Sequence, residues 1–96
     1  MKAIEVLVNG QRICLAGSGV DKGFTFANLT VYESGDPTAS IMVAGSRDKM
    51  VPMWIDDYRI SEDDELVLRV VEVDEADPPI ASSPAWTEFP RVKLDR

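Results

Sequence analysis

The strongest constraint on the fold is an Asn-Gly pair that lies between two alternating stretches near the N-terminus. Residues 2–8 alternate between apolar and other side chains, Asn9-Gly10 follows at once, and residues 11–16 resume an alternating pattern. Both central positions of a type I′ turn need positive φ, which Asn and Gly tolerate, so the pattern predicts a β-hairpin. The two-residue loop predicts a register that pairs Val8 with Gln11, Val6 with Ile13, Ile4 with Leu15 and Glu5 with Cys14.

Strand-like stretches continue along the chain. They cover residues 24–32, 40–44, 50–55 and 66–73, and Gly, Ser, Asp and Pro separate them. A change of phase at Ala27-Asn28 predicts a β-bulge, and Pro52 predicts that its strand begins there or lies at a sheet edge. No window of eleven or more residues carries a helical stripe, because the best candidate, residues 55–66, has no apolar face.

These patterns predict one all-β domain over residues 1–77, a small antiparallel sandwich or partly open barrel of about six strands. A chain of 96 residues leaves no room for a second core. The expected core combines apolar residues from all of these stretches: Ile4, Val6, Ile13, Leu15, Phe26, Val31, Ile41, Val43, Leu66, Leu68 and Val70.

The chain changes character after residue 77. Four of its six prolines lie beyond this point, which predicts an extended Pro-rich C-terminal arm over residues 78–96. Two interpretations of this arm remain open. It packs on its own domain, or it docks on another chain and orders on binding. The expected apolar anchors of the arm are Trp86, Phe89 and Leu94.

The negative charge of the chain is concentrated in one segment. Seventeen acids against ten Lys and Arg give a formal charge of −7. Residues 56–77 alone hold ten acids and two arginines, a net −8, so the other residues sum to +1. Such a run is either a solvated face that protects a sheet edge or an acidic surface that docks a basic protein partner. The ten acids are Asp56, Asp57, Glu62, Asp63, Asp64, Glu65, Glu72, Asp74, Glu75 and Asp77.

The composition excludes several kinds of function. The chain has no histidine and one cysteine, which removes a Cys-His pair, an internal disulfide and a thiolate metal cage. Cys14, opposite Glu5 in the predicted hairpin, is expected to be an unreactive thiol with a raised pKa. The three glycines of residues 17–23 fit no phosphate-binding spacing, and residues 56–65 lack the central glycine of a calcium loop. We therefore expect no catalytic residue, no cofactor and no metal site.

Partners and location follow from the same composition. Nucleic acids and membrane surfaces are polyanions, so the negative balance predicts neither as a partner. The longest apolar runs are too short to span a bilayer, and Glu5 comes too early for a signal peptide, so a cytoplasmic location is expected.

Two stretches of the chain form a recognisable pair. Residues 8–17 read Val-Asn-Gly-Gln-Arg-Ile-Cys-Leu-Ala-Gly, and residues 64–79 read Asp-Glu-Leu-Val-Leu-Arg-Val-Val-Glu-Val-Asp-Glu-Ala-Asp-Pro-Pro. The pair resembles a loose group of small bacterial all-β proteins that have no assigned function. Asp63 stands where this group tends to have Gly, at a turn position that Asp also tolerates. The resemblance implies the fold boundaries and supplies no activity and no site residues.

Two functional hypotheses follow. The first is a non-enzymatic protein-binding module, such as an inhibitor, an immunity protein or an accessory factor, that docks a basic partner through the acidic segment. The second is a structural or assembly subunit, for example a homodimer, that self-associates through the C-terminal arm or through its strand edges. A small hydrolase that uses paired carboxylates is a weaker third hypothesis, because the chain holds little aromatic material to line a cleft.

Overall fold

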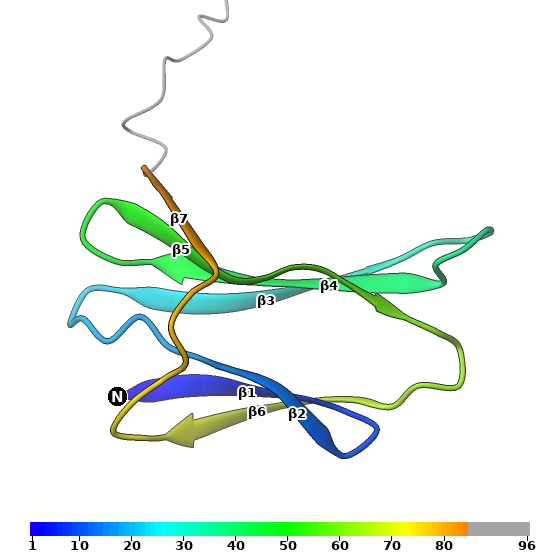
Figure 1. The fold of residues 1–96 in the computed structure, drawn as a ribbon, viewed down its shortest axis with the longest axis horizontal. Helices are drawn as coiled ribbons and strands as arrows, with labels where there is room; N and C mark the ends of the chain where they lie inside the picture. The colour runs from blue at the N-terminus through cyan, green and yellow to red at the C-terminus, as the bar shows by residue number, and fades with distance from the viewer. Residues whose placement is uncertain (85–96) are drawn as a thin grey trace, which may run out of the picture.

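In a computed structural model, which describes residues 1–84, seven strands form two antiparallel sheets packed on each other (Figure 1). Sheet A has the strand order β2-β1-β6, and sheet B has the order β3-β4-β5-β7. The prediction of an all-β fold is confirmed. No helix occurs among residues 1–84, and hence none that could cross a membrane. The strands are β1 (Lys2–Val8), β2 (Gln11–Ala16), β3 (Phe24–Val31), β4 (Ala39–Ser46), β5 (Met50–Ile60), β6 (Leu66–Glu72) and β7 (Ala81–Pro84).

β1 and β2 form the predicted hairpin, but a β-bulge changes its register. Asn9 and Gly10 have φ angles of 53° and 79°, as a type I′ turn requires. The register then shifts between Val6 and Leu7, and a shift of one residue turns the following side chains of β2 to the other face. Three predicted pairs, Val6–Ile13, Ile4–Leu15 and Glu5–Cys14, are therefore wrong, and the observed pairs are Val6–Cys14, Ile4–Ala16 and Glu5–Leu15.

The core lies between the two sheets and draws mainly on β1, β2, β4 and β5. Val6, Ile41 and Val43 are at most 1% exposed, as the alternation predicted. The buried cluster consists of Val6, Val8, Cys14, Ala16, Ala39, Ile41, Val43, Trp54, Ile55 and Ile60. Ile4, Ile13, Ala27, Tyr58 and Leu66 are partly buried and pack against it.

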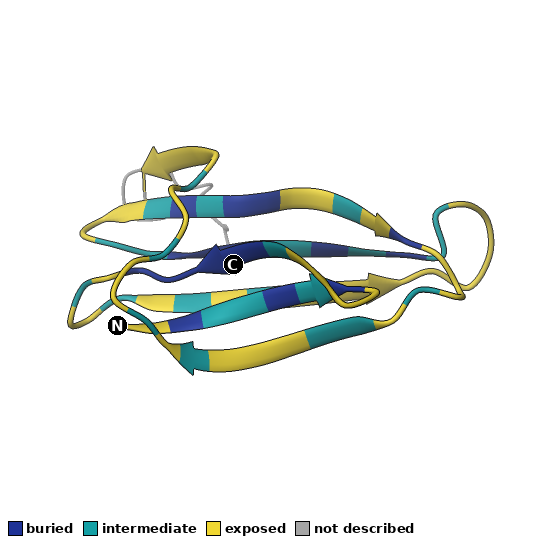
Figure 2. Ribbon diagram, turned by 60° about the horizontal axis from the view of Figure 1, so that its bottom comes forward, coloured by how far each residue is buried: buried dark blue, intermediate teal, exposed yellow. Residues whose placement is uncertain are grey.

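Four predicted core residues are exposed, all of them on β3 and β6. The exposed fractions are 38% for Phe26, 69% for Val31, 45% for Leu68 and 79% for Val70. Neither strand contains a buried residue, whereas each of the four strands that build the core contains several (Figure 2). Within residues 1–84, β3 and β6 are edge strands of their sheets, so each lacks a neighbouring strand on one side.

β3 pairs with β4 without interruption, so the predicted bulge at Ala27-Asn28 is wrong. The change of phase in the sequence has another cause. Phe24 and Phe26 lie on one face of β3, whereas Leu29 lies on the other face, directly opposite the buried Ile41 of β4. Both faces of β3 therefore carry apolar side chains, and only one of them points toward the core.

β5 continues to Ile60 and lies between β4 and β7, so of the two predicted alternatives an edge strand is wrong, whereas Pro52 does lie near the start of its strand, which begins at Met50. The pairing with β4 includes Met53 and residues beyond it, whereas Pro52 pairs only with Ser82 of β7. The missing N–H of Pro52 therefore removes no hydrogen bond from the long β4–β5 ladder. β7 itself lies within the segment predicted to be the C-terminal arm.

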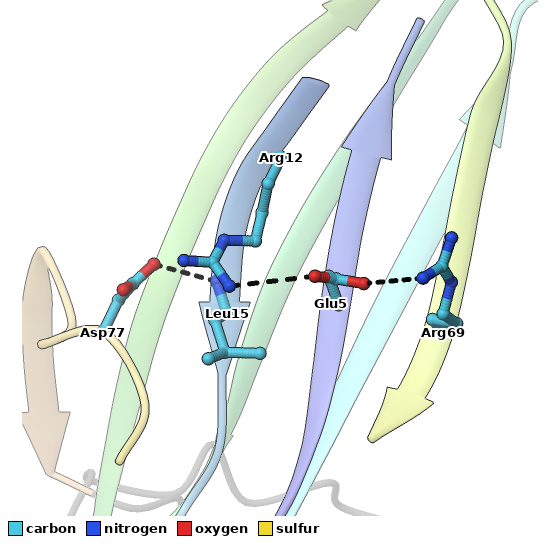
Figure 3. Close-up of polar contacts among 5 residues, drawn as sticks. All are labelled: Glu5, Arg12, Leu15, Arg69 and Asp77. Carbon is cyan, nitrogen blue, oxygen red and sulfur yellow. Dashed lines mark hydrogen bonds and ion pairs between the residues drawn. The ribbon is translucent and has the colours of Figure 1, made fainter. Parts of the chain in front are cut away.

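The segment between β6 and β7 crosses from sheet A to sheet B, and Asp77 is its main contact. The Asp77 carboxylate accepts a hydrogen bond from the backbone N–H of Leu15 on β2, at 2.8 Å (Figure 3). The backbone N–H of Asp77 donates in turn to the Leu15 carbonyl. The Asp77 carbonyl accepts the indole N–H of Trp54 on β5, at 2.7 Å. One residue thus bonds to both sheets, and Asp77 has a structural role.

Candidate binding surfaces

The structure divides the acidic segment between the two ends of β6. Residues 62–65 precede this strand, and Glu72 and residues 74–77 end or follow it. A strand of seven residues is roughly 20 Å long, so the two groups do not form one continuous cluster. Asp56 and Asp57 lie apart from both groups, exposed on β5 in sheet B.

The acidic turn before β6 is held by Asn9. The Asn9 side chain donates to a carboxylate oxygen of Asp64 at 2.9 Å and accepts the N–H of Glu65 at 2.9 Å. The second carboxylate oxygen of Asp64 accepts the N–H of Ser61 at 2.8 Å. The hydrogen bond from Ser61, and then that from Asn9, lower the pKa of Asp64. Asp64 therefore stabilises the turn, and it is less available to a partner than its neighbours Glu62 and Asp63.

Two acids beyond β6 also have intramolecular partners. Glu72 lies 3.4 Å from the N-terminal amine, and Asp77 bonds to both sheets as described above. Asp74 and Glu75 are exposed. Of the ten predicted acids, seven are exposed, and their side-chain carboxylates have no ion pair or hydrogen bond among the described residues: Asp56, Asp57, Glu62, Asp63, Glu65, Asp74 and Glu75. The predicted arm anchors Trp86, Phe89 and Leu94 lie outside the described residues.

Cys14 and Glu5 each have a defined environment in this structure. Burial raises the pKa of the Cys14 thiol to about 11, with a smaller contribution from the charge of Asp77, so the thiol is protonated at neutral pH. The predicted direction is confirmed, although the cause is burial and not Glu5. Glu5 lies between Arg12 and Arg69 on the outer face of sheet A, at 3.7 and 3.4 Å (Figure 3). Within residues 1–84, no three acidic, His or Cys side chains are grouped to hold a metal ion.

The most distinctive surface is an open side of the sandwich, which the sequence patterns did not predict. We define the open side as the free edges of β3 and β6 together with four side chains, Leu29, Val31, Leu68 and Val70. Leu68 and Val70 pair with Val6 and Ile4 and therefore face the interior, as Leu29 and Val31 do opposite Ile41 and Ala39. All four are nevertheless 45% to 79% exposed.

The offset between the two sheets explains this exposure. Across the sandwich, β1 lies against β3 and β2 lies against β5. β6 is the next strand beyond β1, whereas sheet B ends at β3. β6 therefore extends past the edge of sheet B, and no strand among residues 1–84 covers Leu68 and Val70 on its inward face. A strand added next to β3 would fill this position.

A pocket of about 620 Å³ marks one end of the open side, where β6 ends and β3 begins. Ile4 and Val70 form part of one wall, and the residues that lead into β3 form the other. Asp21 and Lys2 are the charged residues in its lining, and Ser18 and Thr25 contribute hydroxyl groups. The pocket is therefore an extension of the open side with both apolar and polar walls.

A comparison with protein-family models, curated proteins and solved structures found no match to this chain. Its function is therefore argued from the surfaces described above.

Proposed function

We propose that this chain is a non-enzymatic protein-binding module, and that its partner adds a strand along the open side. The observation that carries this proposal is the exposure of inward-facing apolar side chains, most of all Val70 at 79% and Val31 at 69%. Single exposed apolar residues are common, but a set of them on the interior face of an edge strand in each sheet is typical of an interaction site.

β3 also lacks the features that normally protect an edge strand. Edges are usually blocked by Lys, Pro, a bulge or an inward-pointing charge. The eight residues of β3, Phe24–Val31, contain no charged residue and no proline, and they pair with β4 without a bulge. Its free backbone groups are available to a further strand, which is the arrangement on which β-augmentation depends. Backbone hydrogen bonds supply affinity in this mode, and alternate side chains supply specificity.

The charge of the described residues indicates what kind of strand binds. Residues 1–84 hold fifteen acids and seven Lys or Arg, a net −8. Long-range attraction of opposite charges and repulsion of like charges favour a basic partner over an acidic one. We propose a partner strand in which apolar and basic residues alternate. Its apolar side chains cover Leu68 and Val70, and its basic side chains face solvent near the exposed acids. Such a module serves as an inhibitor, an immunity protein, an accessory factor or an assembly subunit, according to its partner.

The proposal is tested with a displayed library of eight-residue peptides that vary in charge, apolar periodicity and proline content. Enriched peptides are expected to alternate apolar with Lys or Arg and to lack proline, and their affinity is measured by fluorescence polarisation. Leu68→Thr is expected to weaken binding about tenfold, because it removes apolar area from the interface. Val67→Thr, on the outer face of the same strand, is the matched control and should have little effect.

Two results contradict the proposal. One is equal loss of affinity in Leu68→Thr and Val67→Thr, because the inner face of β6 then has no special role. The other is enrichment of acidic peptides as strong as that of basic ones. A salt titration adds an independent check, since affinity for a basic strand is expected to fall as ionic strength rises.

A further inference from the structure

We infer that, in the absence of a partner, the chain's own terminal segment, residues 85–96, occupies the open side of the same molecule. This inference rests on the proposed function, because it names a tethered competitor for the same site. The paired stretch is residues 91–95, Arg-Val-Lys-Leu-Asp, lying next to β3 and beneath β6. Three observations support it: the place where the segment begins, the path of the exposed apolar residues, and the pattern of charge.

The terminal segment begins near the start of β3. Pro84, the last residue of β7, pairs with Met50 at the start of β5. The tight turn before Met50 leads back to Ser46 at the end of β4, and Ser46 pairs with Phe24. All of these positions lie at one end of sheet B. From β7 to the far side of β3 is three to four strand spacings, roughly 15–20 Å.

The length of the segment is sufficient to reach the open side and to lie along it. Twelve extended residues span at most about 40 Å. Residues 85–90 are enough to cross sheet B, which leaves residues 91–95 to run along β3 from its beginning. Pro90 has no N–H to donate to a ladder, so it separates the crossing stretch from the paired stretch.

Exposed apolar side chains mark this route. Met50 and Phe24 are 38% and 59% exposed at the end of sheet B where the terminal segment starts. Farther along, the open side exposes its inward-facing residues. The terminal segment carries matching groups in the same order, because Trp86 and Phe89 lie in the crossing stretch, and Val92 and Leu94 lie in the paired stretch.

The charge of the terminal segment is opposite to that of the remainder. Residues 85–96 contain Arg91, Lys93 and Arg96 against two acids, a net +1, whereas residues 1–84 carry −8. In a strand, Val92 and Leu94 share one face, and Arg91 and Lys93 share the other. This is the alternation of apolar and basic residues that we propose for a partner strand.

The same molecule is favoured over a second copy as the source of this strand. Because the segment reaches the open side within one chain, its effective local concentration is of the order of millimolar. A second copy competes only at comparable protein concentrations. The terminal segment is then a built-in competitor, and an external strand must displace it before binding.

Nuclear magnetic resonance on the full chain tests the inference directly. We expect nuclear Overhauser contacts from the methyl groups of Val92 and Leu94 to those of Leu68 and Val70. In a sample that mixes labelled and unlabelled chains, these contacts are expected within one chain only. Contacts between chains would overturn the assignment to the same molecule, and absence of the contacts would overturn the inference altogether.

A pair of full-chain variants provides a functional test. Val92→Asn combined with Leu94→Asn removes the apolar face of the paired stretch, and Thr87→Asn is the control in the crossing stretch. The double variant is expected to bind the selected basic peptides about tenfold more tightly than the unsubstituted chain, because the competitor is weakened. The control should bind as the unsubstituted chain does. Equal peptide affinity in all three proteins would contradict the inference.

The two proposals fail in different ways. If peptides bind through Leu68 but the methyl contacts are absent, the open side is a binding site and the terminal segment does not occupy it. If the methyl contacts are present but no peptide binds even the double variant, the terminal segment covers the open side permanently and the proposed function is wrong.

Discussion

At the scale of single residues, Asn9 has two roles in this fold. It adopts the positive φ of the hairpin turn, and its side chain binds both Asp64 and Glu65 in the turn before β6. The sequence predicted the first role, because Asn-Gly is a local signal. It did not predict the second, because residues 55 positions apart in the chain meet only after β6 pairs with β1. Asp63 is not among the residues with positive φ, so the replacement of Gly implied by the family resemblance causes no backbone strain there.

Asp64 makes the stability of the protein depend on pH. Hydrogen bonds from Ser61 and Asn9 lower its pKa below the ordinary value of 3.8, so the folded state favours the charged carboxylate. This contribution to stability is present above pH 3.8 and is lost as the pH falls through the lower pKa of the folded state. We expect Asp64→Ala to lower the urea midpoint at pH 7 and to have a smaller effect near pH 3. Asp63→Ala is the control, and an equal pH dependence in both variants would contradict the argument.

At the scale of the strands, the close approach of the β3 backbone to β4 explains why position 45 is glycine, which no sequence pattern identified. Gly45 of β4 pairs with Thr25 of β3, and a Cβ atom at position 45 would clash with the Phe24 carbonyl oxygen. A flexible side chain could move away from the added Cβ atom, whereas the backbone carbonyl of a paired strand cannot do so without distorting the sheet. We expect Gly45→Ala to cost about 1–3 kcal/mol in urea unfolding and to increase hydrogen exchange in β3. Gly10→Ala is a useful contrast, because its added Cβ meets nothing and only its φ of 79° is unfavourable. Unchanged exchange in β3 would contradict this explanation.

Sequence patterns predicted where most strands lie, because alternation and turn residues are local properties. They did not predict which strands cover one another. Leu66, Leu68 and Val70 have the spacing of a buried face, and they do face inward, yet the offset of the sheets leaves most of this face uncovered. The bulge in the first hairpin was also missed, because nothing near Ile13 signals an extra residue. The open side was therefore beyond local analysis, although the apolar residues on both faces of β3 and β6 were a usable signal.

At the scale of the whole molecule, the two sheets are joined by their core and by the segment that contains Asp77. Asp77→Ala removes the acceptor of the Leu15 N–H and is expected to cost about 1–2 kcal/mol. Asp74→Ala, three residues earlier and exposed, removes the same charge and is expected to change stability by less than about 0.5 kcal/mol. Equal unfolding free energies for the two variants in urea would show that charge, and not the hydrogen bond, is responsible.

The position of Asp77 also determines how the molecule responds to tension. β7 has four residues, and it runs antiparallel to β5, with Pro84 as the last residue that the structure describes. A pulling force applied at Pro84 is therefore expected to separate β7 from β5 one residue pair at a time, from Pro84 back to Ala81, at low force. The load then reaches Asp77, whose bonds to Leu15 and Trp54 must break together. β7 is thus expected to detach at low force, whereas the segment that contains Asp77 is expected to resist a higher force.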